Sequence, residues 1–138
     1  MALRAREYSA AVMRYSASLA KKMGLEVSEV AALEHLQAGG PMTIGHLAGR
    51  LSMSAGAVTT LVDRLVKKGY VERAPNPEDR RSQLVRGTER GFEESLRHLL
   101  PYIREMKQIE EEFTDDERAV IARYLAATTE AAHRHSGG

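Results

Sequence analysis

The stretch from Thr43 to Gly91 constrains the fold of this chain more than any other part of its 138 residues. It contains two segments in which apolar residues recur at intervals of three and four positions, which is the spacing of an amphipathic helix. The apolar positions are Ile44, Leu47, Ala48 and Leu51 in the first segment and Val58, Leu61, Val62 and Leu65 in the second. Because the connection between them is very short, the sequence predicts two helices that are joined by a tight turn.

Residues that favour helix ends and turns surround both segments. Thr43 and Ser54 are predicted N-caps, and Gly69 is a predicted C-terminal cap. Residues 70–73 and 83–86 are predicted to form two short strands, because the loop between them is rich in turn-forming residues. Two close helices followed by a small hairpin are typical of a winged helix-turn-helix, a module that places its second helix in a groove of DNA.

The sequence predicts two helices before this module. Residues 2–23 carry one apolar stripe at helical spacing, formed by Tyr8, Val12, Tyr15 and Leu19. Gly24 is expected to end this helix. Ser28 is expected to cap the next one, with Glu29 in a first turn where the helix dipole favours an acid. The second helix should end at the Gly-Gly-Pro sequence of residues 39–41.

Two more helices are predicted after the hairpin. Thr88 is expected to cap a long helix with a coiled-coil-like seam, in which Pro101 should kink or strain one turn. The seam residues are Phe92, Leu96, Leu99, Ile103 and Met106. Thr114 and Glu117 have the spacing of a capping box and should begin the last helix. The apolar positions of that helix are Val120, Ile121, Tyr124 and Leu125.

The predicted fold is mainly α with a small β-wing, in a single domain that covers residues 1–138. Residues 28–91 form the winged helix-turn-helix, and residues 1–23 and 92–135 form N- and C-terminal dimerisation helices. These outer helices carry more apolar surface than one small domain should need. A two-fold homodimer would bury that surface and place two reading helices about one DNA turn apart. Packing within one chain is the alternative.

The composition excludes several other classes of protein. Cysteine is absent, which excludes disulfides, thiolate metal sites and a cysteine redox switch. There is no G-x-S-x-G sequence and no phosphate-binding loop, so we expect no enzyme activity. The five histidines are scattered, so we expect no metal and no cofactor, although a metal-dependent regulator remains an alternative. No apolar run reaches the roughly 18 residues of a membrane helix, and no signal core follows the N-terminus, which predicts a cytoplasmic protein with no membrane partner.

The charge of the chain is unevenly distributed. The whole sequence has a net charge of +1, but residues 43–91 contain nine Lys or Arg residues and five Asp or Glu residues. A positive excess on this module is what contact with DNA phosphates requires. Statistical scatter is the alternative, because the excess is modest.

The second helix of the module has small and polar residues on the side opposite its apolar stripe, where bulk would hold a helix away from the bases. The candidates for DNA contact are Ser54, Ala55, Gly56, Thr59, Thr60 and Arg64 in this helix and Asp79, Arg80 and Arg81 at the hairpin tip. The threonines can donate to phosphates or bases and touch a thymine methyl. Arginines at a narrow loop can enter the minor groove, and Asp79 could aim one of them through an ion pair. A solvated helix face and a solvated turn are the alternatives.

The chain resembles the MarR family of transcriptional regulators along nearly its whole length. The resemblance rests on GGPMTIGHLAGRLSMSAGAVTTLVDRLVKKGYVER and NPEDRRSQLVRGTERG in this order and spacing, and more weakly on FTDDE and the first helix. It implies an obligate homodimer whose first, fifth and sixth helices interlock. It also implies that the two winged modules read a palindromic operator in double-stranded DNA, and that the protein is a repressor released by a small-molecule effector.

In many proteins of this family the effector is a small aromatic or anionic molecule that enters a cleft between the dimer arms and the reading module. Arg14, Tyr15 and His35 are candidates for contacting one here, because an anion needs a cation and an aromatic ring favours flat neighbours; surface and dimer packing is the simpler alternative. The sequence departs from the family at Gly87, where a bulky apolar residue usually helps to anchor the wing. This departure motivates an alternative function, that of a dimeric protein-interaction module that kept the fold and lost tight DNA binding.

Overall fold

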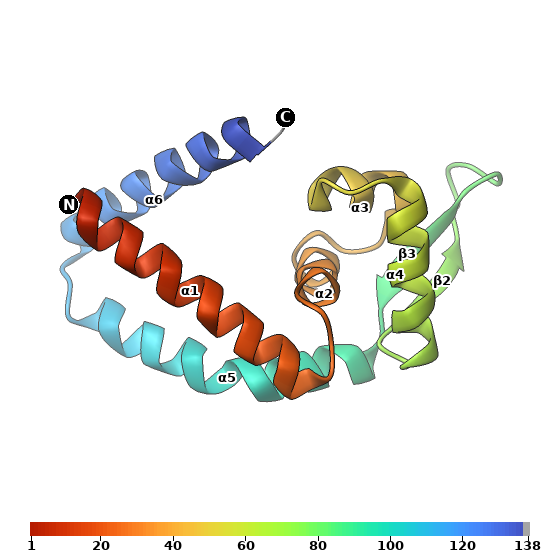
Figure 1. Ribbon diagram of the computed structural model, residues 1–138, viewed down its shortest axis with the longest axis horizontal. Coiled ribbons are helices and arrows are strands. Elements are labelled where there is room, and N and C mark those ends of the chain that lie inside the picture. Colours follow the sequence, from red (N-terminus) through yellow and green to blue (C-terminus); the bar gives the residue numbers. More distant parts are fainter. Residues whose placement is uncertain (137–138) are drawn as a thin grey trace. The chain divides into compact units, whose positions relative to one another are not determined.

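The computed structural model describes residues 1–136 and divides into two compact units, one ending at His98 and the other beginning at Leu99 (Figure 1). The first unit contains α1 (Ala2–Met23), α2 (Val27–Gly39), β1 (Met42–Thr43), α3 (Ile44–Leu51), α4 (Ala55–Lys67), β2 (Val71–Pro75), β3 (Gln83–Gly87) and the first turns of α5 (Glu89–Glu111). The second unit contains the rest of α5 and α6 (Asp115–Ser136). The prediction of a mainly helical fold with a small β-wing is confirmed.

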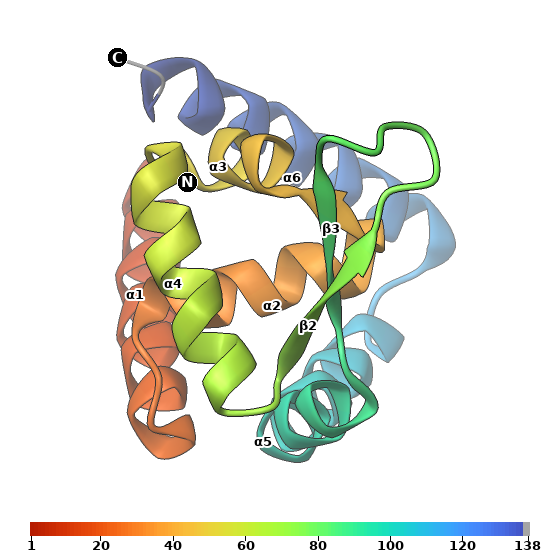
Figure 2. The ribbon, with the colours of Figure 1, turned by 90° about the vertical axis from the view of Figure 1, so that its right-hand side faces the viewer.

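The core of the first unit lies where α2 meets α3, α4 and the sheet. All four predicted apolar positions of α4, namely Val58, Leu61, Val62 and Leu65, are completely buried. Leu33 of α2 and Leu47 of α3 are also buried, and α4 contacts both of these helices. Figure 2 shows α2 behind α4 and the two long strands. Burial of each such side chain contributes about 1.5–3 kcal/mol, so this core fixes α4 with its opposite side facing solvent.

The sheet has three antiparallel strands in the order β1-β3-β2, whereas the sequence predicted only a two-stranded hairpin. The additional strand β1 places Met42 opposite Val85 and Thr43 opposite Leu84. Two residues are too few to show the alternation by which strands are recognised. The hairpin strands also extend to Pro75 and Gly87, beyond the predicted ends. Strand β1 therefore attaches β3, at Leu84 and Val85, directly to the start of α3.

The helix ends of the first unit match the predictions with one exception. The side chains of Thr43 and Ser54 accept hydrogen bonds from the backbone N–H groups of His46 and Ala57, at 3.1 and 3.2 Å. The prediction of Ser28 as an N-cap is wrong, because α2 already begins at Val27. The Glu29 carboxylate accepts a hydrogen bond from the N–H of Glu26 at 3.1 Å, in the three-residue spacing of a capping box.

The wing and α4 are joined to α5 by a close backbone contact. Gly69 has a φ of +78° and ends α4, with the N–H of Tyr70 bonded to the Leu65 carbonyl. Thr88 donates its hydroxyl hydrogen to the Gly69 carbonyl at 2.6 Å and accepts from the N–H of Gly91 at 3.0 Å, which confirms it as a cap. A Cβ at Gly91 would lie 2.2 Å from the Tyr70 carbonyl oxygen, so only glycine fits there.

The second unit consists of helices whose apolar side chains remain exposed. The capping box at the start of α6 is confirmed, since the Thr114 N–H donates to the Glu117 carboxylate at 2.7 Å and the Glu117 N–H donates to the Thr114 hydroxyl at 3.2 Å. Pro101 lies inside α5, which continues across it as one helix. None of the residues of α6 is buried, and Val120 and Leu125 are 55% and 47% exposed.

Candidate nucleic-acid interface

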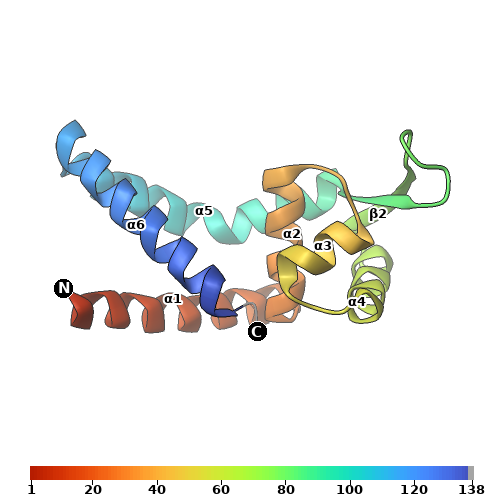
Figure 3. The same ribbon diagram turned by 90° about the horizontal axis from the view of Figure 1, so that it is seen from above.

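The nine residues predicted to contact DNA are all exposed. They come from α4, its N-cap Ser54 and the loop of residues 76–82 between β2 and β3, here called the wing loop. Figure 2 shows α4 and the wing open to the same side of the first unit, and Figure 3 shows the wing loop projecting beyond the strands. Because the buried stripe of α4 fixes its rotation, Gly56, Thr60, Asp63 and Lys67 lie along the opposite, outward side. Thr59 and Arg64 flank them.

The start of α4 offers backbone donors for an anion. The Ser54 hydroxyl caps the N–H of Ala57, and the first bond along the helix runs from the Val58 N–H to the Ser54 carbonyl. The N–H groups of Ala55 and Gly56 precede that bond. Free amides at the positive end of a helix dipole favour a phosphate oxygen.

The two threonine hydroxyls of α4 are engaged within the helix. Thr59 donates its hydroxyl hydrogen to the Ala55 carbonyl at 2.9 Å, and Thr60 donates to the Gly56 carbonyl at 3.2 Å. The sequence allowed these hydroxyls to donate to bases or phosphates. In the structure they present lone pairs and γ-methyl groups, while their hydrogens point back into the helix.

Arg64 takes part in an ion pair on one flank of α4. Its guanidinium lies 3.4 Å from the carboxylate of Glu26, just before α2, with both side chains about half exposed or more. Lys68 donates to the backbone carbonyl of Gly24 at 2.7 Å. An exposed pair of this kind contributes about 0.2–1 kcal/mol, so the contact positions Arg64 without holding it irreversibly.

Two further ion pairs tie the wing together and to α4. Arg73 of β2 bonds to Asp63 of α4, which fixes the strand to the outward side of the helix. Arg86 bonds to Glu72 at 2.7 Å across the directly opposed positions of β3 and β2. Sequence reasoning missed both pairs, because their partners are ten or more positions apart and no local spacing relates them.

The wing loop is shaped by hydrogen bonds from side chains to the backbone. Asp79 accepts from the backbone N–H of Arg81 at 2.9 Å, and Asn76 accepts from the N–H of Glu78 at 3.1 Å. The expected ion pair between Asp79 and a neighbouring arginine does not occur among residues 1–136. The Asp79 carboxylate shapes the turn instead, because a short acidic side chain readily binds a backbone N–H two residues later.

A hollow of about 400 Å³ lies between the wing and the start of α3. Its lining includes Arg73 and Arg81 of the wing and the first residues of α3, Ile44 and Gly45. Arg81, which has no ion-pair partner within residues 1–136, and the positive end of the α3 dipole favour an anion here, whereas Arg73 is already paired with Asp63. The hollow therefore extends the positive surface from the wing toward α3.

The basic residues of the module fall into two groups. Five are engaged within the chain. Arg64, Lys68, Arg73 and Arg86 make the polar contacts described above, and the Arg90 guanidinium lies 5.7 Å from the centre of the Tyr70 ring. The other four are Arg50, Lys67, Arg80 and Arg81, which are exposed and have no ion-pair partner within residues 1–136. Phosphate contacts by these four require no internal ion pair to break.

Two of the three candidate effector residues lie near an acidic side chain. Tyr15 and His35 both lie close enough to Glu34 to interact with its charge, whereas Arg14 is exposed on α1. Burial and the nearby Glu34 carboxylate raise the pKa of Tyr15. Desolvation raises the pKa of Glu34, and His35 partly opposes this effect. A carboxylate at this position opposes the binding of an anion.

Within residues 1–136, no group of three histidine or acidic side chains is arranged to hold a metal ion. In the same range, no helix has the length and apolar character needed to cross a membrane.

Comparison with known proteins places this geometry in context. Residues 23–82 match the model of the MarR family. The chain is 32% identical over 124 residues to YsmB of Bacillus subtilis, described as an HTH-type transcriptional regulator, covering 82% of this chain and 83% of YsmB. It is 42% identical over 66 residues to YcgE of the same organism, also described as an HTH-type transcriptional regulator, and this match spans 48% of the chain and 43% of YcgE.

A solved structure extends the comparison to a DNA complex. The crystal structure of a cysteine-to-serine mutant of MarR from Escherichia coli, complexed with operator DNA, superposes with a TM-score of 0.61 at 26% identity. The match covers 90% of this chain and 91% of the MarR chain.

Proposed function

Because this chain belongs to the MarR family of transcriptional regulators, we propose that it binds a palindromic operator as a homodimer, with α4 of each subunit in the major groove and each wing loop in the adjacent minor groove. The proposal rests on two features that lie on the same side of the first unit. A helix with an outward face of small and polar residues lies beside a loop whose arginines, Arg80 and Arg81, have no ion-pair partner in the described chain. A helix needs small and polar outward residues to reach the base edges, and contact with the phosphates needs unpaired cations such as these arginines.

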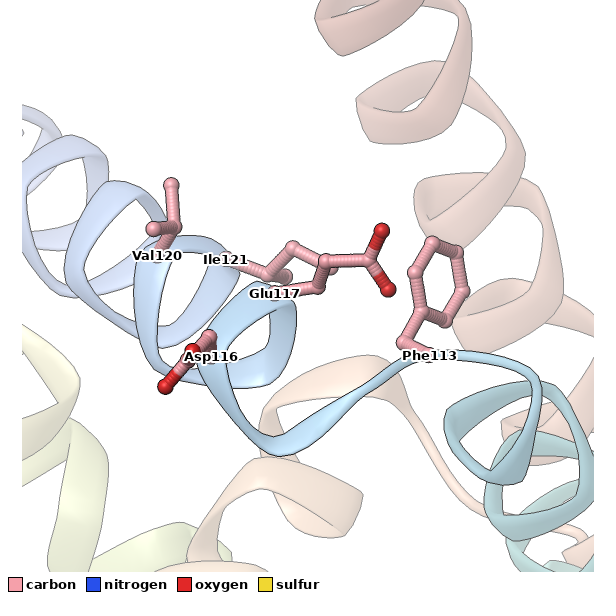
Figure 4. Close-up of a pocket in the computed structure, with 5 residues that line it drawn as sticks. All are labelled: Phe113, Asp116, Glu117, Val120 and Ile121. Carbon is pink, nitrogen blue, oxygen red and sulfur yellow. The ribbon is translucent and has the colours of Figure 1, made fainter.

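The homodimer is supported by the exposed apolar residues of the second unit. Phe113, Val120 and Ile121 line a hollow of about 370 Å³ at the turn between α5 and α6, which Figure 4 shows with the Glu117 carboxylate beside the Phe113 ring. A second hollow of about 350 Å³ includes Met106 and Leu125. A helix as long as α6 gains most of its stability from packing an apolar face, and a second copy of the chain would supply that packing. We propose that residues 1–23 and 92–135 serve as dimerisation helices of one functional domain; residues 137 and 138 lie outside the described structure.

Selection from a random duplex library tests this function. We expect recovery of palindromic sequences that bind with sub-micromolar affinity, with weaker binding to scrambled duplexes of equal length at two salt concentrations. The proposal extends to repression by operator occlusion in the cytoplasm and to release by a small aromatic or anionic effector. A panel of aromatic acids added to the selected complex tests that extension, which loses its support if none weakens the binding.

Arg81→Ala is expected to weaken DNA binding and to lower the salt dependence of the binding constant. Each lost phosphate contact reduces the slope of log K against log salt concentration by about one unit. Gel-shift titrations over a series of salt concentrations measure this slope. The double variant Glu72→Gln/Arg86→Gln is the matched control, since it removes one internal ion pair of the same hairpin without changing the net charge. An unchanged slope for Arg81→Ala would refute the contact.

The open space at Gly87, at the base of the wing, favours a second candidate function, that of an interaction module without tight DNA binding. Gly87 ends β3 opposite Val71, and a Cβ added there would meet no atom within 4 Å. No side chain therefore fills the place where the family usually has a bulky apolar residue. Failure of the selection to recover any sequence, with a folded and dimeric protein, would favour this candidate.

Gly87→Val is expected to stabilise the wing. Glycine inside a strand costs about 0.5–1 kcal/mol relative to residues with less backbone freedom, and the open space accepts a branched side chain. We expect a higher unfolding midpoint in urea and a severalfold tighter complex with the selected duplex. Greater stability with unchanged DNA affinity would mean that attachment of the wing does not limit binding.

A further inference from the structure

Gly56 lies on the outward side of α4 at a position where the fold of this chain does not require glycine. A Cβ added there would meet no atom within 4 Å, and the φ of Gly56 is not positive. Glycine in a helix costs about 1 kcal/mol of stability relative to alanine. Gly91 is different, because a Cβ there would collide with a carbonyl oxygen. A partner outside the chain that approaches this outward part of the helix closely would account for a glycine at position 56.

Thr60 lies one turn beyond Gly56 on the same side. Its hydroxyl hydrogen is donated to the Gly56 carbonyl. With Oγ1 turned to its own helix, the side chain offers its γ-methyl group and the oxygen lone pairs to a ligand. Thr59 is arranged in the same way against the Ala55 carbonyl.

The charged side chains nearest to this point are already engaged in ion pairs, and Lys67 lies about two turns beyond Thr60. Asp63 is bonded to Arg73, and Arg64 is bonded to Glu26. In the major groove guanine presents only the acceptors N7 and O6, which require a donor, whereas thymine presents a 5-methyl group. The first turns of α4 are therefore better matched to a thymine methyl than to guanine.

We propose that Thr60 is a specificity-determining residue whose γ-methyl packs against the 5-methyl of one thymine in each half-site, and that Gly56 allows the helix backbone to approach that base. The inference rests on the proposed function, because it needs α4 to lie in the major groove. In this proposal Thr60 and Gly56 together distinguish thymine from the other bases. Contact between two methyl groups excludes water without requiring any hydrogen bond to rearrange.

Replacement of thymine by deoxyuridine in the selected duplex tests the proposal with the unmodified protein. This substitution removes only the 5-methyl group, which lies in the major groove, and leaves base pairing and the minor groove unchanged. We expect one thymine in each half-site at which the replacement weakens binding about fourfold, as burial of one methyl group implies. Equal affinity for every such duplex would overturn the proposal.

Two variants of Thr60 assign the effect to this residue. Thr60→Ser keeps the hydroxyl and removes the methyl, and it should bind the thymine and deoxyuridine duplexes equally. Thr60→Val keeps a methyl and removes the hydroxyl, and it should retain the fourfold ratio. If the serine variant keeps the ratio or the valine variant loses it, Thr60 is not the residue that reads the methyl.

The variant Gly56→Ala distinguishes an effect on the stability of the fold from an effect on DNA binding. We expect this variant to resist urea better than the unmodified protein and to bind the selected duplex at least about tenfold more weakly, because a methyl on the outward side holds the helix away from the base. Unchanged affinity would refute the close approach at Gly56. Failure of the unmodified protein to select any sequence would overturn the proposed function and this inference together, whereas selective binding without an effect of deoxyuridine overturns the inference alone.

Discussion

Gly91→Ala is expected to lower the free energy of unfolding by about 3 kcal/mol, at the upper end of what overpacking costs. The new Cβ would lie 2.2 Å from the carbonyl oxygen of Tyr70, which is backbone and cannot rotate away. The same carbonyl accepts a hydrogen bond from the Thr88 N–H at 3.0 Å, so displacement of the helix start would also break the joint between the wing and α5. Urea unfolding followed by circular dichroism measures the loss.

Gly49→Ala is the matched control for this prediction. Gly49 lies in α3, and a Cβ there would meet no atom within 4 Å. The substitution should raise the stability by up to about 1 kcal/mol, because alanine has the higher helix propensity. If both variants changed the stability in the same direction, the close contact at Gly91 would not be the cause.

Leu125→Asp is expected to convert the proposed dimer into monomers and to weaken operator binding at least about 100-fold. Leu125 is 47% exposed on α6, so the charge costs little in a single chain but would be buried in a dimer without a partner. Loss of the second reading helix removes the gain from bivalent binding, which is about 10²–10⁴-fold. Sedimentation equilibrium measures the oligomeric state, and gel-shift titration measures the affinity.

Ala126→Asp provides the control for the charge itself. Ala126 is the next residue of α6 and lines neither of the two hollows of the second unit. This variant should remain dimeric and bind the operator as the unmodified protein does. A dimeric Leu125→Asp variant with full affinity would show that the apolar face of α6 is not the interface.

Local signals predicted most of the fold. The helical spacing of Val58, Leu61, Val62 and Leu65 gave the buried face of α4 correctly, because these positions depend only on the helix period and on burial. The caps at Thr43, Ser54 and Thr88 were predicted for a similar reason, since a cap and its N–H partner are three residues apart.

Features that depend on distant partners were not predictable. Strand β1 exists only because β3 lies beside it, and two residues show no strand pattern of their own. Ser28 was a plausible cap by residue type, but Glu29 bonds to the N–H of Glu26 and moves the start of α2. The ion pairs of Asp63 and Arg64 with Arg73 and Glu26 also depend on tertiary packing.

The candidate interface was also predictable only in part. The residue types on α4 and at the wing tip indicated a DNA-contacting surface, but the sequence could not show which groups are already engaged. The hydroxyls of Thr59 and Thr60 donate within the helix, and Asp79 binds a backbone N–H. These bonds decide which donors remain for DNA, and they follow from side-chain conformations that sequence spacing does not specify.

A hydroxyl-radical footprint of the unmodified protein on its selected duplex tests the central claim most directly, namely that two copies of the chain each place α4 in the major groove of one operator. We predict two protected patches on each strand, related by two-fold symmetry, with half-site centres about one helical turn apart. A single patch, or uniform weak protection along the duplex, would contradict the paired reading of DNA by this protein.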